Sequence, residues 1–387
     1  MHIWKQAGIS AKSSRKWADL LDIAVVLCLL LAGVSLCLSV LAWRRDTPLS
    51  WRFALPEPVE AEGDPRFDTV LDYTPEAGQA HSPGIVVEKD AFEILWFEGS
   101  AEAQSDVDIY AARFERTAGV WDKTKTGPRL TRANLSTVMD PPQIVVTLGN
   151  TIENEAQTGG LWATVASIGG WAMASIVDVP GQGGAARKLN LSPFLGRSNL
   201  VKSPMVAYAD GSMGLPAYFE MGSTFGLLAR FDAQDRVRDT RRMSGVGKPI
   251  QPMIVPLSET RAIAFLREFN LDMKLLLCRT EDGGQSWSRV EALEVFNPSS
   301  PVAALGLGEG RILLAMNDLE DAPNDLRLVL SEDEGQSWRE LTRFRGEGAL
   351  RYPMLRRLSS GEIVLSYSKG NKQGVVVHVF NQAWVEA

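Results

Sequence analysis

Two stretches of this chain, Thr280–Trp287 (TEDGGQSW) and Ser331–Trp338 (SEDEGQSW), share one pattern of eight residues. In such a pattern the aspartate accepts backbone hydrogen bonds inside a turn, and the glycine takes up a positive φ. The tryptophan packs beneath the hairpin that the turn closes. The two stretches therefore predict two similar β-hairpins, and we give Asp282 and Asp333 a structural and not a catalytic role.

The spacing of the two stretches predicts how the whole domain is built. Asp282 and Asp333 lie 51 residues apart, and one four-stranded blade of a β-propeller takes about 40 to 50 residues. Weaker repeats of similar spacing occur at Asp232, at Trp121 and Trp171, and at Trp384; chance resemblance is the alternative for these. Short apolar runs between Gly, Asn, Asp and Pro are typical of many short strands. Together these features predict an all-β, six-bladed β-propeller of sialidase-like type.

The first 65 residues have a different character. Four basic residues precede an uncharged run, 23–43, which is long enough to cross a bilayer as a helix. We predict a basic cytoplasmic segment at 1–17, a transmembrane helix (signal anchor) at 18–43, a linker rich in Pro, Glu and Asp at 44–65, and the propeller at 66–387.

The charge distribution also predicts where the propeller lies. Positive charge on the N-terminal side of the span keeps that end in the cytoplasm. We therefore expect a single-pass protein of the inner (cytoplasmic) membrane, with the propeller on the periplasmic or extracellular side. The alternative is a signal peptide cleaved after Val40-Leu41-Ala42, which makes the protein secreted.

Composition limits the partners and cofactors that we expect. The formal net charge of −7 argues against a nucleic-acid partner, because nucleic-acid binding needs a basic face. Three cysteines and three histidines show no metal-binding spacing, so we expect no cofactor and no metal site. The acidic stretch 318–325 is interpreted as a solvated loop, with cation binding as the alternative.

Several further segments, in order along residues 78–387, resemble the sialidase (neuraminidase) superfamily, and within it bacterial sialidase-like proteins with Asp-box (BNR) repeats. They are Leu95–Arg113, Lys202-Ser203-Pro204, Leu215–Glu220, Gln251-Pro252, Asn297–Ser300, Arg351-Tyr352-Pro353, Gly361-Glu362-Ile363 and Tyr367. The resemblance implies a retaining glycosidase in which a tyrosine replaces the usual carboxylate nucleophile.

The resemblance also implies a role for particular residues. Asp106 takes the place of the acid/base aspartate, Tyr352 that of the nucleophile, and Glu220 that of the base which deprotonates Tyr352. Each has an ordinary alternative, namely a solvated loop carboxylate, a core tyrosine and a surface carboxylate. Five residues are expected to contact the substrate, the arginines by gripping its carboxylate: Arg267, Lys202, Arg351, Gln251 and Asn297.

The chain departs from the family pattern at its first blade. His81-Ser82-Pro83 stands where sialidases carry Arg-Ile-Pro, so the first arginine of the carboxylate-binding triad is missing. His81 is expected to fill this place, binding an anion when protonated or acting as acid or base with Tyr352. A histidine bonded to a backbone carbonyl is the structural alternative.

Three functions follow from these residues. The first is a membrane-anchored, exo-α-sialidase-like glycosidase for the terminal acidic sugars of glycans. The second is a hydrolase or lyase for another, uronic sugar that uses His81 and Tyr352. The third is a propeller without catalytic activity that binds a glycan or a partner protein. Fold alone does not separate them, because function depends on the site.

Overall fold

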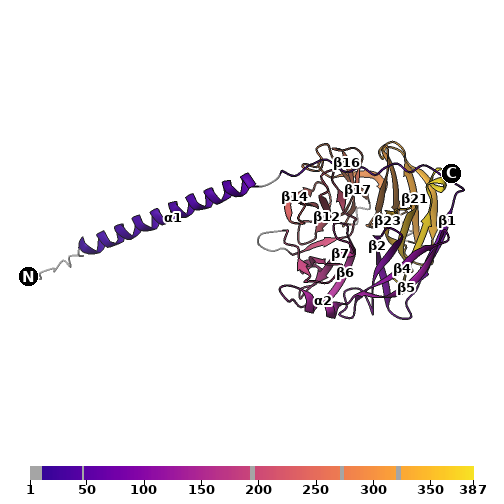
Figure 1. The fold of residues 1–387 in the computed structure, drawn as a ribbon, viewed down its shortest axis with the longest axis horizontal. Helices are drawn as coiled ribbons and strands as arrows, with labels where there is room; N and C mark the ends of the chain where they lie inside the picture. The colour runs from indigo at the N-terminus through magenta and orange to yellow at the C-terminus, as the bar shows by residue number, and fades with distance from the viewer. Residues whose placement is uncertain (1–10, 46–47, 192–196, 271–273, 320–323) are drawn as a thin grey trace, which may run out of the picture. The chain divides into compact units, whose positions relative to one another are not determined.

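The computed structural model describes residues 11–45, 48–191, 197–270, 274–319 and 324–387, and it divides into two compact units, Met1–Leu49 and Ser50–Ala387. The described residues of the first unit contain the helix α1 (Ala11–Arg45), shown in indigo in Figure 1. Within it Asp22–Ala42 is long and apolar enough to cross a membrane, a property that a signal sequence shares. The borders that we predicted for the cytoplasmic segment, span and linker stay predictions.

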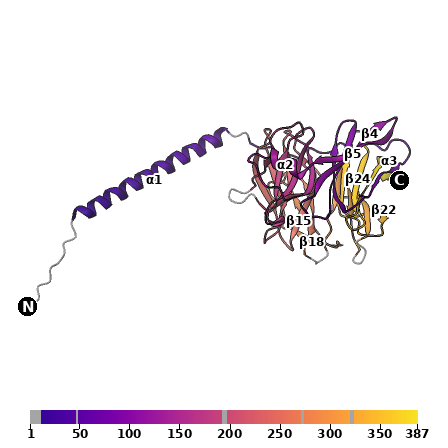
Figure 2. The ribbon, with the colours of Figure 1, turned by 90° about the horizontal axis from the view of Figure 1, so that it is seen from below.

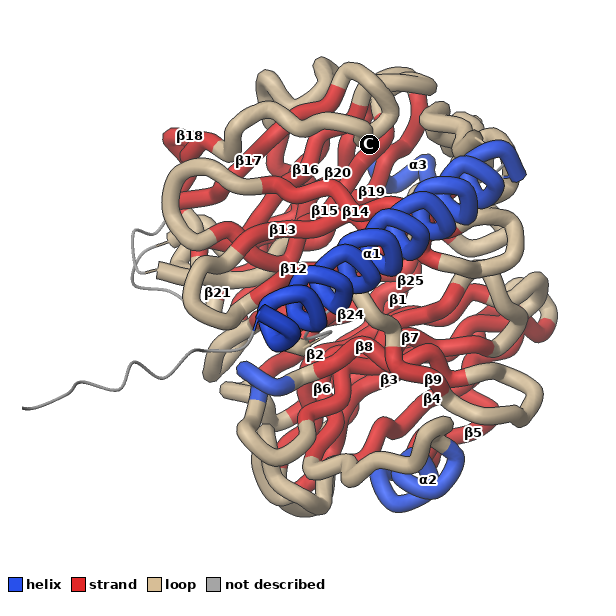
Figure 3. The backbone as a smooth tube through the Cα atoms, turned by 90° about the vertical axis from the view of Figure 1, so that its left-hand side faces the viewer, coloured by secondary structure: helices blue, strands red, loops and turns tan. Residues whose placement is uncertain are grey.

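The second unit is a six-bladed β-propeller, as predicted. Its described residues form six antiparallel sheets, whose strands pair largely in chain order. Figures 2 and 3 show that strands make up most of this unit, and in Figure 3 the short helix α2 (Arg132–Val138) lies at its lower edge. The first blade contains β2 (Gln79–Val87), β3 (Ala91–Gly99), β4 (Asp108–Thr117) and β5 (Val120–Leu130), and the second contains β6 (Thr147–Asn154), β7 (Gly160–Ala166), β8 (Ser175–Val179) and β9 (Arg187–Lys188). The third blade contains β10 (Asn199–Val201), β11 (Val206–Ala207), β12 (Met213–Phe219), β13 (Phe225–Phe231) and β14 (Val237–Met243). The fourth contains β15 (Pro249–Pro256), β16 (Ala262–Glu268), β17 (Lys274–Thr280) and β18 (Glu291–Phe296), and the fifth contains β19 (Ala303–Gly308), β20 (Arg311–Met316), β21 (Asp325–Ser331) and β22 (Arg339–Arg345).

The last blade joins the two ends of the domain. It contains β23 (Arg351–Arg357), β24 (Ile363–Lys369) and β25 (Gly374–Phe380), and its fourth strand is β1 (Phe67–Tyr73) from the start of the domain. The register pairs Phe67 with Phe380. Trp384, in the C-terminal helix α3 (Gln382–Glu386), packs against Phe67 with ring centroids 4.6 Å apart. Backbone pairing and aromatic packing thus close the ring without a covalent link.

The two predicted hairpins lie where the sequence places them, between the third and fourth strands of the fourth and fifth blades. Asp282 accepts hydrogen bonds from the Ser286 backbone N–H at 2.9 Å and from the Thr280 hydroxyl at 2.8 Å. Asp333 likewise accepts a hydrogen bond from the Ser337 backbone N–H, at 2.8 Å. These contacts confirm that the motif builds a turn.

The weaker repeats have mixed outcomes. Asp232 makes the equivalent turn in the third blade, where it accepts the Gln234 N–H at 2.9 Å. Trp121 follows the corresponding turn of the first blade and packs on Phe92. Trp171 instead lies in a short 3₁₀ helix between β7 and β8, the second and third strands of its blade. Its spacing from Trp121 is therefore a coincidence.

Part of the predicted linker packs on the propeller. Phe53 is buried against Tyr208, and its backbone N–H donates to Glu259 O at 2.7 Å. The buried guanidinium of Arg230 lies 3.2 Å from the Tyr208 ring centroid and bonds Ser50 O at 2.7 Å. The apolar and aromatic side chains within this polar segment explain the contact. We call residues 50–59 the strap.

Candidate functional site

A repeated irregularity in the first strand of several blades creates the site. In β2, β6, β15 and β23 the pairing with the next strand skips two residues near the N-terminal end. In three of these strands a residue with positive φ stands there and a proline follows: Ser82 (56°), Gln251 (53°) and Tyr352 (57°). A non-glycine residue seldom adopts this conformation, and such strain concentrates at functional sites. Gln251 and Tyr352 thereby line one central pocket.

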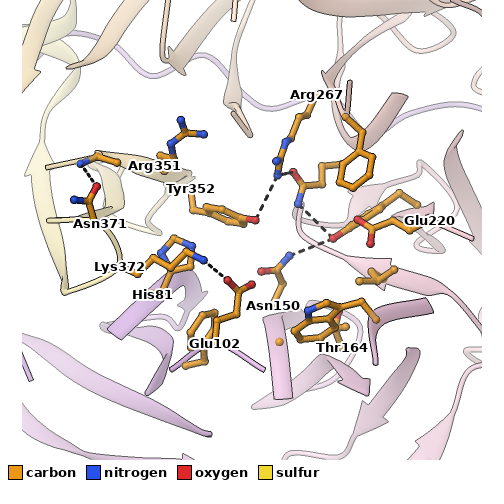
Figure 4. A pocket seen from close by; sticks show the side chains of 18 residues that line it. His81, Glu102, Asn150, Thr164, Glu220, Arg267, Arg351, Tyr352, Asn371 and Lys372 are labelled. Carbon is orange, nitrogen blue, oxygen red and sulfur yellow. Dashed lines mark hydrogen bonds and ion pairs between the residues drawn. The ribbon is translucent and has the colours of Figure 1, made fainter. Parts of the chain in front are cut away.

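This pocket has a volume of 590 Å³. Its floor comes from the first and second strands of the blades, and its sides come from the loops between second and third strands. Figure 4 shows side chains from several blades that converge on this space. The polar and charged side chains that line it include His81, Glu102, Asn150, Tyr218, Glu220, Gln251, Arg267, Arg351, Tyr352 and Lys372.

Tyr352 and Arg267 meet in the pocket, as the sequence predicted for a nucleophile and a carboxylate ligand. Arg267 Nη1 donates to Tyr352 Oη at 3.4 Å and to Gln251 Oε1 at 3.5 Å, and its Nε donates to Ser299 Oγ at 3.4 Å (Figure 4). These distances lie beyond the usual range for strong hydrogen bonds. The guanidinium thus keeps much of its capacity to bind an anion.

Tyr218 is a second tyrosine beside this pair, and our sequence analysis did not select it. Its hydroxyl accepts hydrogen bonds from Gln251 Nε2 at 3.3 Å and from Asn150 Nδ2 at 3.4 Å. Burial, followed by the charge of Glu220, raises the pKa of Tyr218 well above its ordinary value. Tyr218 therefore stays a neutral phenol that holds Gln251 and Asn150 in place.

Three cations surround His81. Burial lowers the pKa of His81 well below its ordinary value, and Lys372, Arg351 and Arg267 lower it further. His81 is thus uncharged at neutral pH, which counts against the predicted role as a protonated anion binder. The three cations supply positive charge in this part of the pocket instead.

His81 also lies next to Tyr352, as the alternative hypothesis requires. The two ring centroids are 4.5 Å apart, and the imidazole is 2% exposed. Within the described part of the chain, neither ring nitrogen of His81 has a hydrogen-bond partner. Because buried polar atoms are nearly always bonded, this histidine has two free positions for a ligand.

Two carboxylates face the same space. Burial raises the pKa of Glu220, an effect that Arg267 opposes and Glu102 reinforces. Glu102, on the loop after β3, forms an ion pair with Lys372 on the loop after β24 (Figure 4). Asn371 and Lys372 both have positive φ, so the backbone of this loop is held in a conformation that few side chains adopt.

Three residues that we predicted at the site lie elsewhere, and none of them is among the described residues that line the pocket. Asp106 is exposed and accepts hydrogen bonds from the Ser100 N–H at 3.1 Å and hydroxyl at 3.0 Å, which close a turn in the first-blade loop. Hydrogen bonds from Ser100 also hold the pKa of Asp106 below its ordinary value, so it is a poor proton donor. Glu102, on that same loop, reaches the pocket instead.

Lys202 and Asn297 have structural contacts. Lys202 is fully buried and donates to Pro353 O at 2.6 Å, while burial lowers its pKa to about 7. Asn297 accepts the Ser300 N–H at 2.8 Å and is also buried. Both positions looked functional because they neighbour pocket strands in sequence, but their side chains point into packed regions.

Some of the pocket residues that we did not predict lie near a recognisable motif, and others do not. Glu102 and Tyr218 lie within segments that support the family resemblance, four residues before Asp106 and two before Glu220. Asn150 and Lys372 lie outside every motif that we recognised. The fold alone brings these two to the pocket, from β6 and from the last loop before β25.

Metal binding finds no support in the described residues, which contain no group of three or more His, Cys, Asp or Glu side chains placed to hold an ion. In the acidic stretch 318–325, Asp318 and Asp325 are engaged by Arg343 at 2.9 and 2.5 Å. Arginine side chains thus neutralise both carboxylates. Residues 320–323 of the stretch lie outside the described residues.

The chain belongs to the BNR repeat-like domain family, which matches residues 90–365, and it is a sialidase-like BNR-repeat propeller. A protein of unknown function from Dyadobacter fermentans has a TM-score of 0.61 at 13% identity, with 81% of this chain and 97% of that chain covered. A Hadza microbial sialidase has a TM-score of 0.56 at 14% identity, with 77% and 65% covered. The Trypanosoma rangeli sialidase in complex with sialic acid has a TM-score of 0.56 at 13% identity, with 85% and 59% covered.

These structural similarities concern the fold, because the identities are low. The chain spans less than two thirds of the length of the two sialidases named. No curated protein matches the sequence. The site must therefore be interpreted from its own residues.

Proposed function

We propose that this propeller is a sialidase-type glycoside hydrolase that binds a carboxylated terminal sugar in its central pocket and cleaves its glycosidic bond. The observation that carries the proposal is the contact between Arg267 and the Tyr352 hydroxyl, in a pocket that also holds Arg351, Lys372 and two glutamates. A phenol suits an anionic sugar, since an ionised carboxylate nucleophile would be repelled by the sugar's own charge.

The cations account for binding. Arg267 and Arg351 offer guanidinium groups whose present bonds, at 3.4 to 3.5 Å, are weak enough to be exchanged for a carboxylate. Lys372 is the third cation and replaces the arginine that is missing at His81. Its ion pair with Glu102 has to open when a ligand carboxylate arrives.

The carboxylates and Tyr352 account for cleavage. Glu220, whose pKa burial raises, takes the Tyr352 proton, directly or through water, as the tyrosine oxygen bonds to the anomeric carbon. The bond to the leaving oxygen breaks, and the leaving group takes its proton from Glu102, which has picked up a proton from solvent after the ligand carboxylate displaced it from Lys372. Water then releases the sugar from Tyr352 by the reverse sequence, with Glu102 as the base.

Fluorophore release from an aryl α-glycoside of sialic acid tests this function. Tyr352→Phe should abolish release and retain binding of free sialic acid, because it removes only one oxygen. Tyr110→Phe is the matched control, since Tyr110 lies outside the pocket and stacks on Trp96. Undiminished release by Tyr352→Phe excludes the tyrosine as nucleophile, and wild-type protein that neither releases the fluorophore nor binds sialic acid excludes this substrate.

The contact between His81 and Tyr352 favours a second function, a lyase for uronic sugars. A neutral imidazole with free ring nitrogens can take the C5 proton of a uronic acid, while Tyr352 gives a proton to the departing C4 oxygen. The product gains a C4–C5 double bond and absorbs in the near ultraviolet. That absorbance should be lost in His81→Ala. Bound sugar without either product indicates the third function, a non-catalytic binding propeller.

We also propose that α1 anchors the protein in the inner membrane, with the propeller outside the cytoplasm. The uncharged span and the basic residues before it support this orientation. The mass of the protein recovered from membranes distinguishes an anchor from a signal peptide. An intact N-terminus supports the anchor, and a chain that begins at Trp43 supports cleavage.

A further inference from the structure

Large apolar side chains lie exposed on the loops that surround the pocket. The loops between second and third strands contribute Ile168 in the second blade, Met221 in the third and Phe269 in the fourth, which are 75%, 36% and 45% exposed. Leu319 follows on the same loop of the fifth blade. Ile144, which is 67% exposed, lies beside the second-blade loop that carries Ile168, because the Ser167 hydroxyl donates a hydrogen bond to Ile144 O at 3.2 Å.

These residues are continuous with the pocket and are not a separate surface. Trp171, on the same loop as Ile168, lines the pocket. Phe269 lines it as well, and Met221 directly follows the pocket residue Glu220. The apolar residues therefore form one side of the rim, on the second to fourth blades, while Glu102 of the first blade and Lys372 of the last blade also face the pocket.

A ligand that lies in the pocket has to meet this rim. When a carboxylate binds at Arg267 and Arg351 on the floor, the group attached to the sugar leaves through the mouth, past Trp171 and Phe269. Beside Ile168, Met221 and Phe269, a sugar-like attached group would place its hydroxyls against side chains that form no hydrogen bonds. An apolar group would instead bury surface there, at about 25 cal/mol per Å².

The form of the rim argues against a protein as its occupant. Its residues come singly from separate loops around an opening, whereas a stable protein interface needs a larger continuous surface. A small apolar group attached to the bound sugar fits this arrangement.

We propose that the substrates of this pocket are carboxylated sugars with an apolar aglycone, such as an alkyl or lipid chain, which Ile144, Ile168, Met221 and Phe269 contact. This inference rests on the proposed binding of a carboxylated sugar. It adds that affinity comes from both ends of the ligand, the anion on the floor and the apolar group at the rim.

Binding of matched glycosides by the full chain in detergent-free nanodiscs tests the inference. The probes are the methyl and octyl α-glycosides of sialic acid and the corresponding glycosides of glucuronic acid, measured by calorimetry below the micelle concentration of the octyl compounds. We expect the octyl glycoside of the sugar that binds to have a Kd about tenfold lower than the methyl glycoside, because several methylenes become buried.

Variants separate rim contact from non-specific adsorption. The double variant Ile144→Ser and Ile168→Ser should remove most of the octyl advantage and leave methyl-glycoside binding unchanged, since both side chains lie outside the polar floor. Val120→Ser is the control, because Val120 is 61% exposed on a hairpin between third and fourth strands, remote from the pocket loops.

Each result decides the inference. Equal affinity for methyl and octyl glycosides overturns it and leaves the proposed sugar binding intact. An octyl advantage that survives in the double variant, or that Val120→Ser also removes, overturns it as well. If none of the four glycosides binds, the proposed function fails, and the inference fails with it.

Discussion

At the scale of the residue, the surrounding structure holds several side chains at or beside the pocket in unusual states. Tyr352 has a positive φ, His81 is buried without a partner among the described residues, and Lys202 is buried with a single acceptor, Pro353 O. The facts on Tyr352 and Lys202 concern the same bulge, because Pro353 follows Tyr352. Lys202 thus supports the backbone that presents Tyr352 to the pocket.

Lys202 gives a pH-dependent prediction. Burial lowers its pKa to about 7 in the folded protein, against about 10.4 when unfolded. Between these values the unfolded chain binds more protons, so this residue makes the free energy of unfolding rise with pH, by up to about 1.4 kcal/mol per pH unit. We expect Lys202→Met to lack this rise in urea unfolding from pH 6.5 to 9.5. The same slope in both proteins would show that Lys202 is not titrating there.

At the scale of the element, loops from the first and last blades meet at the pocket through Glu102 and Lys372. The Glu102 carboxylate is paired with Lys372, the cation that the carboxylate of a bound sugar needs. We expect Glu102→Gln to bind free sialic acid several-fold more tightly than wild type, by calorimetry, because competition for Lys372 is removed. The same variant should lose turnover, because in the proposed mechanism the leaving-group proton comes from Glu102.

Two controls accompany this prediction. Lys372→Met should weaken the same binding, since it removes one of three cations. Glu115→Gln should change nothing, because Glu115 is an exposed partner of Arg113 on β4. Weaker binding by Glu102→Gln would show that Glu102 contacts the ligand directly and does not compete with it.

The Asp-box hairpin supplies a second prediction at this scale. Asp282→Ala removes the acceptor for Ser286 and Thr280, and we expect it to lower the free energy of unfolding by about 2 kcal/mol. Glu281→Ala, at the exposed neighbouring position, should have little effect. Sugar affinity should stay unchanged in both, and a loss of affinity in Asp282→Ala would show that the hairpin influences the pocket.

At the scale of the whole molecule, the propeller is held together by its N-terminal residues. The strap lies against Tyr208 and Arg230, and β1 completes the last blade. We expect a soluble form that begins at Ser50 to have a clearly higher Tm than one that begins at Asp64, because the shorter form exposes Tyr208 and leaves Arg230 without Ser50 O. Equal Tm values would mean that the strap contributes nothing to the thermal stability of the propeller.

The fold was largely predictable because its signals are local. The Asp-box turns repeat in sequence, and their spacing of 51 residues sets the length of a blade. The strap was missed because proline and acidic residues dominate its composition, while burial depends on Phe53 and on a distant partner, Tyr208. The chance spacing of Trp121 and Trp171 also misled the repeat pattern, since a separation in sequence does not identify the loop.

The candidate site was predictable only where a motif marks the pocket strand. His81, Glu220, Gln251, Arg267, Arg351 and Tyr352 were selected from the sequence and line the pocket. Asp106 was selected in place of Glu102, because both lie on one loop and sequence does not tell which side chain turns inward. Asn150 and Lys372 had no motif at all.

The sequence by itself determined the six repeated blades, the apolar helix and the strands that carry Tyr352 and Arg267, because turns, apolar runs and repeats are properties of neighbouring residues. Only the tertiary structure decided which charges share one space. Closure of the ring brings Lys372 of the last blade to Glu102 of the first, and Arg267 to Tyr352, 85 residues apart. Contacts between residues so distant in the chain depend on the complete ring.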